Sequence, residues 1–95
     1  MMCGRPISRI RSVQIIEEIL QNEVLSVVRQ QGYVLETEIC TMVCEKYNLH
    51  LYIVRATLRR IYLEMALQKR RMSEDLKRFY GLEVIGYPIV YLPDK

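Results

Sequence analysis

The sequence predicts a single α+β domain that is mainly helical, and three observations lead to this class. The chain has 95 residues, 51% of them hydrophobic and 26% charged, which suits one modest core in a globular protein. Apolar residues recur at helical spacing through most of the chain. The last residues, LEVIGYPIVYLPDK, are instead rich in β-branched and aromatic types, which is typical of a strand or hairpin.

The first helix is expected over residues 12–31, with Gly32 just past its end as a C-terminal cap. Glu23 falls inside the apolar stripe of this helix, whereas Ile15 and Leu25 fall outside it. Either the helix breaks beside Glu23, or a second apolar surface exists for a partner; we favour the partner. The apolar stripe itself consists of Ile16, Leu20, Val24, Val27 and Val28.

A short extended piece at residues 33–35 precedes a second predicted helix over residues 36–47. The apolar residues Ile39, Val43 and Tyr47 are spaced by four and indicate a buried helical face. Asn48 adopts a left-handed conformation at low cost and is expected to end this helix.

Three cysteines, at positions 3, 40 and 44, do not make a disulfide framework. Cys40 and Cys44 lie one helical turn apart, where the geometry for a mutual disulfide is poor, so we interpret them as small buried residues. The single histidine and the absence of a second cysteine pair argue against a metal site, and no cofactor is expected.

The third helix is expected over residues 50–67, with a narrow apolar stripe and its arginines on the opposite side. The run ALQKRRM, residues 66–72, looks extended or frayed, and a short fourth helix follows between Ser73 as N-cap and Gly81 as stop. Pro88 restricts the final β element to an edge or to the start of a strand. The stripe of the third helix consists of Val54, Leu58, Ile61 and Met65.

Charge is distributed unevenly, although the net charge is only +3. Between Arg55 and Arg78 there are eight basic residues against three acidic ones, and the acidic residues gather in residues 17–45. Residues 1–11 form a second basic cluster, which we interpret as an arm preceding the domain of residues 12–95. A one-sided basic field attracts phosphate, so these clusters indicate a nucleic-acid partner.

The order of these elements and the run EKYNLHLYIVRATLRR resemble the winged helix-turn-helix domains of bacterial and archaeal transcription regulators. In such a domain, Asn48 would lie at the turn and Leu49 would pack behind it. The run RATLRR is similar to the start of many recognition helices. The resemblance covers roughly residues 24–92, with a helix-like insert where a short hairpin loop is usual.

The resemblance implies a small, sequence-specific protein that binds double-stranded DNA with residues 50–67 in the major groove. It would be a homodimeric regulator of transcription, because one recognition helix reads few base pairs and because apolar positions remain outside the core stripe. The implied DNA contacts are Tyr52, Arg55, Ala56, Arg59 and Arg60 on this helix, Lys69, Arg70 and Arg71 at the wing, and Arg5, Arg9 and Arg11 in the arm, which would reach an adjacent minor groove.

Two other functions stay open: a winged-helix module that binds protein, and an RNA-binding or replication accessory protein. An enzyme is not expected, because the four glycines are scattered and form no phosphate-binding loop. No apolar run is long enough to span a membrane, and the basic N-terminus leads into Glu17 and Glu18 without the apolar core of a signal peptide. We therefore expect a cytoplasmic protein, associated with the nucleoid or, if viral, in the host cytoplasm.

Overall fold

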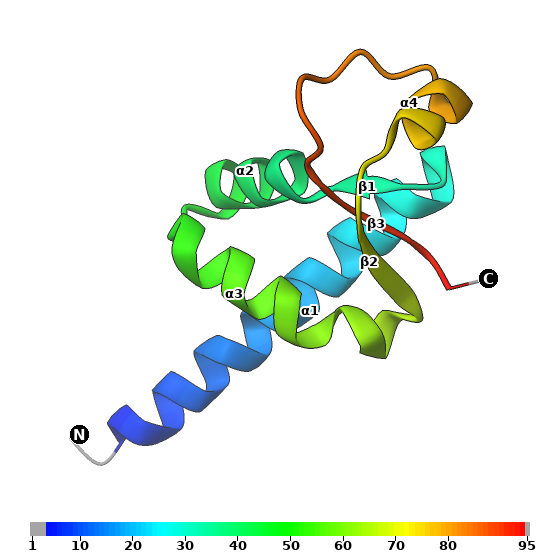
Figure 1. Cartoon of the computed structure of the whole chain (residues 1–95). Helices are drawn as coiled ribbons and strands as arrows, with labels where there is room; N and C mark the ends of the chain where they lie inside the picture. Colours follow the sequence, from blue (N-terminus) through cyan, green and yellow to red (C-terminus); the bar gives the residue numbers. More distant parts are fainter. Residues whose placement is uncertain (1–3, 95) are drawn as a thin grey trace.

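The computed structural model describes the backbone of residues 4–94 and the side chains of residues 12–94. Within this range the chain is α+β and mainly helical, with four α-helices and a three-stranded antiparallel sheet (Figure 1). In chain order the elements are α1 (Gly4–Gln31), β1 (Val34–Leu35), α2 (Glu36–Tyr47), α3 (Leu51–Ile61), the 3-10 turn η1 (Tyr62–Met65), β2 (Leu67–Arg71), α4 (Glu74–Tyr80) and β3 (Ile89–Pro93).

The sheet has the strand order β1-β3-β2, so the last strand lies in the middle. Tyr91 of β3 pairs with Val34 on one side and with Lys69 on the other. Since successive side chains of a strand point to opposite faces, the sheet separates two apolar clusters. One contains Tyr91 and packs against α1, α2 and α3, while the other contains Val90 and packs under α4 and the segment that follows it.

Local signals in the sequence explain where α2 and α3 begin and end. Asn48 ends α2 in the left-handed conformation, with a φ angle of 56°, as the sequence predicts. His50 then begins α3, because its Nδ1 accepts a hydrogen bond from the backbone N–H of Tyr52. Leu49, between them, packs against the main core. The predicted apolar stripe of α3 is confirmed, because all of its members are buried.

The predicted length of the third helix is wrong. The α-helix ends at Ile61 rather than near Leu67, and the 3-10 turn η1 tightens the chain as far as Met65. Ala66 then takes a left-handed conformation, with a φ angle of 56°, which turns the chain into β2. Leu67 thereby enters the core from the sheet instead of from the helix.

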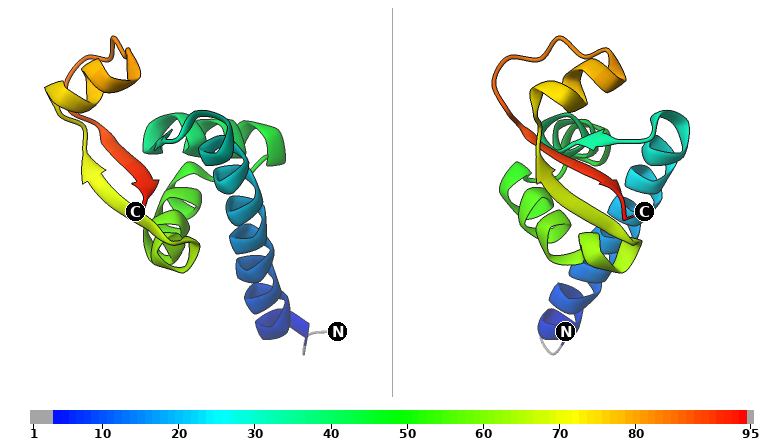
Figure 2. Two further views of the ribbon diagram at one scale, coloured as in Figure 1. Left: turned by 90° about the vertical axis from the view of Figure 1, so that its right-hand side faces the viewer. Right: turned by 45° about the vertical axis from the view of Figure 1, so that its right-hand side comes forward.

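The predicted start of the first helix is also wrong, because α1 begins at Gly4 rather than at Ser12. It continues unbroken past Glu23 to Gln31, where Gly32 follows with a φ angle of 87°. The N-terminal part of α1 projects beyond the rest of the chain, which helps to give overall dimensions of 55 × 25 × 19 Å (Figure 2). No helix in residues 4–94 has the length and apolarity needed to cross a membrane.

Candidate nucleic-acid interface

The predicted contact residues of α3 and β2 all lie at the surface. Tyr52, the largest of them, has 66% of its area exposed. The others that share this exposure are Arg55, Ala56, Arg59 and Arg60 on α3 and Lys69, Arg70 and Arg71 on β2. All of these residues are therefore exposed. Some of them form ion pairs with acidic side chains of the same chain, and the others do not.

Arg59 is held by an acidic side chain of α2. Its Nε and Nη2 donate to the two carboxylate oxygens of Glu36 at 2.8 and 2.7 Å, a bidentate pair. The hydroxyl of Tyr91 donates to the same carboxylate at 2.7 Å. One carboxylate thus joins α2, α3 and the central strand of the sheet, and we call these three residues the Glu36 cluster.

The Glu36 cluster is an interior feature with one edge at the surface. Glu36 is 5% exposed and Tyr91 is fully buried, whereas the side chain of Arg59 is 46% exposed. Burial alone would raise the pKa of Glu36, but hydrogen bonds from Arg59 and Tyr91, with the charges of Arg59 and Arg55, lower the pKa below its ordinary value. Burial and the same carboxylate raise the pKa of Tyr91, so its hydroxyl stays protonated.

Arg60 is also engaged, because its Nη1 donates to the carboxylate of Glu17 on α1. A third ion pair explains the acidic residue within the apolar stripe of α1. The carboxylate of Glu23 accepts hydrogen bonds from Lys46 Nζ at 2.8 Å and from the hydroxyl of Tyr47 at 2.6 Å. These bonds lower the pKa of Glu23 and fasten α1 to the end of α2. No local pattern predicts these partners, because they lie 24 and 43 positions apart in the sequence.

Arg55 differs from its neighbours on α3. It lies one helical turn before Arg59 and is exposed, and no ion pair joins it to an acidic side chain within residues 12–94. The charge of Arg55 acts on Glu36 from a distance. Its guanidinium group is therefore available to a ligand in a way that those of Arg59 and Arg60 are not.

Lys69 on β2 is linked to α3 through two aromatic side chains. Its ammonium group lies 5.8 Å from the ring centre of Tyr62, which itself lies 5.5 Å from the ring centre of Tyr91. Because the hydroxyl of Tyr91 reaches Glu36 and thereby Arg59, an unbroken series of contacts connects Lys69 to the outer side of α3. This series runs through the buried Tyr91, so it joins β2 to α3 through the interior of the protein.

The three consecutive basic residues of β2 do not share one face of the sheet. Lys69 and Arg71 are on one face of β2, and Arg70 is on the other. Arg70 is the strand partner of Val90, so its face is the one with the second apolar cluster. Arg71 donates from its Nη1 to the backbone oxygen of Tyr87 at 3.0 Å and so holds the segment before β3 against β2.

The predicted contacts in the N-terminal arm lie outside the described side chains. The backbone at Arg5, Arg9 and Arg11 belongs to the first turns of α1.

The cysteines are free thiols on α2. Cys40 is buried, as predicted, and burial is the main reason that its pKa rises to about 12. Cys44 is half-buried against the core. Among the residues with described side chains, no group of three or more histidines, cysteines and acids is arranged to hold a metal ion.

Comparisons with protein-family models, with curated proteins and with solved structures find no match to this chain.

Proposed function

We propose that the chain is a winged-helix protein that binds double-stranded DNA through α3 and β2 and regulates transcription. The support for the winged-helix assignment is the element order helix, strand, helix, helix, strand, strand, together with the antiparallel sheet order β1-β3-β2. The insert that contains α4 replaces the short loop that is usual between the last two strands of such domains.

The observation that carries the proposal is the presence of exposed basic residues on both α3 and β2. Arg55 is exposed on α3 without an ion pair in residues 12–94, and Lys69 is exposed on β2, with its ammonium group 5.8 Å from the ring centre of Tyr62. An α-helix fits into the major groove, where an arginine side chain can bind base edges. A lysine on β2 can bind the backbone phosphates. In this proposal Arg59 and Arg60 mainly hold α3 in its orientation, since acids of the same chain already bind them.

The test is fluorescence anisotropy of a labelled mixed-sequence duplex, titrated with protein at a series of salt concentrations. We expect affinity to fall with a log–log salt slope of about −4 to −8, which corresponds to roughly four to eight neutralised phosphates. Binding that does not depend on salt, or no binding at low salt, would refute the proposal.

The proposal includes homodimerisation, but the apolar residues proposed for the dimer surface differ from those that the sequence indicates. Leu25 packs against the core and so is no surplus apolar residue, whereas Val13 and Ile15 on the projecting part of α1 are 38% and 48% exposed. A two-fold dimer predicts a palindromic site with half-site centres about 34 Å apart or a multiple of this distance. Sedimentation equilibrium should give twice the chain mass, and a monomer at all concentrations would contradict this part.

A protein-binding module is the second candidate, favoured by the start of α3. Leu51 and Ile53 are each 46% exposed and flank Tyr52, so the helix presents apolar side chains where a DNA-reading helix usually presents polar ones. This candidate predicts a salt-resistant complex with another protein and no duplex binding. The salt titration therefore separates the two functions.

A further inference from the structure

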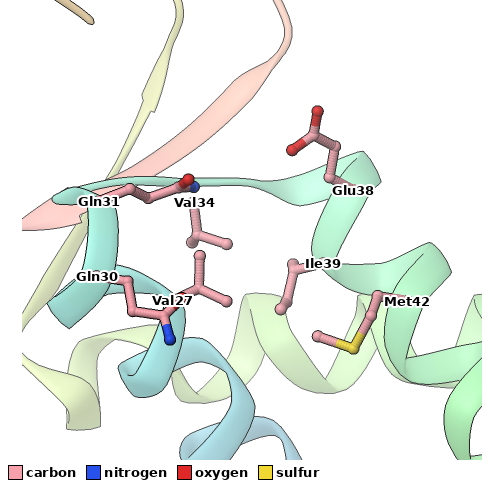
Figure 3. A pocket seen from close by; sticks show the side chains of 7 residues that line it. All are labelled: Val27, Gln30, Gln31, Val34, Glu38, Ile39 and Met42. Atoms are coloured by element: carbon pink, nitrogen blue, oxygen red, sulfur yellow. The ribbon is translucent and has the colours of Figure 1, made fainter.

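A hollow of about 240 Å³ opens where the C-terminal end of α1, strand β1 and helix α2 diverge (Figure 3). Its floor is apolar and comes from all three elements, with Val27 of α1, Val34 of β1, and Ile39 and Met42 of α2. Val34 and Ile39 are 2% exposed, so this floor continues the main core. Figure 3 shows these four side chains directed toward the same space.

The rim of the hollow is polar and carries one formal charge. Gln30 and Gln31 stand on the α1 side and Glu38 on the α2 side. Glu38 is exposed, and no ion pair engages it within residues 12–94, in contrast to Glu17, Glu23 and Glu36 of the same half of the chain. Gln31 donates its amide N–H to the backbone oxygen of Tyr33 at 2.9 Å, which fixes the side chain beside the opening.

The size and the lining together specify a ligand class. An apolar cavity of about 150 Å³ accommodates one benzene ring, so a hollow of about 240 Å³ has room for a ring with a short side chain. An unpaired carboxylate at the mouth attracts a cation, and glutamine carbonyl oxygens accept hydrogen bonds from an ammonium group. We propose that this hollow binds a small organic amine, with its apolar body on the floor and its ammonium group at Glu38.

The site is separate from the candidate nucleic-acid interface. Because a helix turns about 100° per residue, Glu38 lies about 160° and Met42 about 120° around α2 from Glu36. A ligand in the hollow would brace α1 against α2, and α3 packs on α2. The inference goes beyond DNA binding and does not depend on it, but an occupied hollow would be placed to alter the orientation of α3.

The test is a titration of the whole chain with 2-phenylethylamine, followed by NMR of the methyl groups of Val27, Val34, Ile39 and Met42. For a ligand of this size we expect saturable shifts with a dissociation constant on the order of 1–10 mM. The neutral analogue 2-phenylethanol should bind roughly three- to tenfold more weakly, because it lacks the charge.

Two matched variants test whether the carboxylate of Glu38 binds the ammonium group of the ligand. Glu38→Gln should weaken binding of the amine by roughly three- to tenfold and leave binding of the alcohol unchanged. Glu45→Gln removes another exposed acid of α2 that does not line the hollow, and should change neither. Both residues are exposed, so neither change threatens the fold. Equal binding of amine and alcohol, or equal effects of the two variants, would overturn the proposed ligand class.

A third variant tests the place of binding. Met42→Phe puts a ring into the hollow from a half-buried position and should abolish the shifts at Val27 and Val34, while the melting temperature shows that the chain remains folded. Shifts that persist in this variant, or that fail to saturate in the wild type, would overturn the site. Duplex binding is measured in a separate titration. A chain that binds no DNA could therefore still bind the amine, and the reverse.

Discussion

The middle and the C-terminal end of α3 carry arginines with different surroundings. Arg59 and Arg60, near the C-terminal end, each contact a carboxylate of another helix, whereas Arg55, one turn earlier, has no acidic partner within residues 12–94. The same residue type on the same helix thus has two roles. Near the end of α3 arginine joins helices together, and near its middle arginine faces solvent and any ligand there.

A basic stretch of sequence is therefore not the same as a basic surface. Two acids of residues 17–45, Glu17 and Glu36, pair with arginines of the basic helix, so part of its charge is neutralised within the chain. Arg55 and the basic residues of β2 remain exposed without an ion pair in residues 12–94, and they are the part of this charge that we propose binds phosphate. Variants can therefore separate stability from DNA affinity along one helix.

The largest effect on stability is expected from Glu36→Ala. The variant leaves the buried hydroxyl of Tyr91 without its partner and removes the link from α2 to Arg59. We expect a loss of about 2–4 kcal/mol in the free energy of unfolding, since Arg59 itself stays half-exposed. Denaturant unfolding followed by circular dichroism measures it. Thr37→Ala, at the exposed next position, is the control. Equal stability of the two variants would show that the Glu36 cluster does not hold the helices.

A smaller effect, on DNA binding, is expected from the double variant Lys69→Ala/Arg71→Ala, which also removes the hydrogen bond from Arg71 to the backbone oxygen of Tyr87. Two lost phosphate contacts should reduce the magnitude of the log–log salt slope by about 2 and weaken binding roughly tenfold or more at moderate salt. The control is Arg29→Ala, at the exposed end of α1. An unchanged slope in the double variant, or the same change in the control, would separate β2 from the binding surface.

The smallest effect is a dependence of stability on pH. The pKa of Glu36 is lower in the folded chain than its ordinary value of 4.5, so unfolding takes up a proton near that pH. The stabilisation by this carboxylate is complete above about pH 5 and is lost as pH falls through the lowered pKa. Unfolding curves of wild type and Glu36→Gln should converge between pH 5 and more acidic values. A difference that stays constant over this range would contradict the lowered pKa.

Much of the fold could be predicted because its signals are local. The helix of residues 36–47, the left-handed Asn48 and the short helix between Ser73 and Gly81 each follow from residues within a few positions of one another. The end of α3 could not be predicted in this way. It depends on Ala66 in a left-handed conformation, which alanine rarely adopts, and the sheet imposes it by drawing Leu67 into the core.

The candidate site could be predicted as a set of residues but not as a set of contacts. Exposure of Arg55 and of Lys69 follows from the apolar periodicity of their neighbours. The pairing of Arg59 requires Glu36, 23 positions earlier, and Glu36 in turn binds Tyr91, 55 positions later. The residues around Glu36 indicate only an acidic side chain in the first turn of α2, where the helix dipole favours it. Its central position depends on how the helices pack, which no short stretch of sequence encodes.

The most direct test of the two roles is a paired measurement on Arg55→Ala and Arg59→Ala, with unfolding free energy and duplex affinity determined for each. We predict that Arg55→Ala weakens duplex binding roughly five- to tenfold and changes stability by less than about 0.5 kcal/mol. Arg59→Ala should lower stability by about 1–3 kcal/mol and, per folded molecule, change affinity less than Arg55→Ala does. The opposite pattern, with affinity lost mainly in Arg59→Ala and stability unaffected by either variant, would contradict the account.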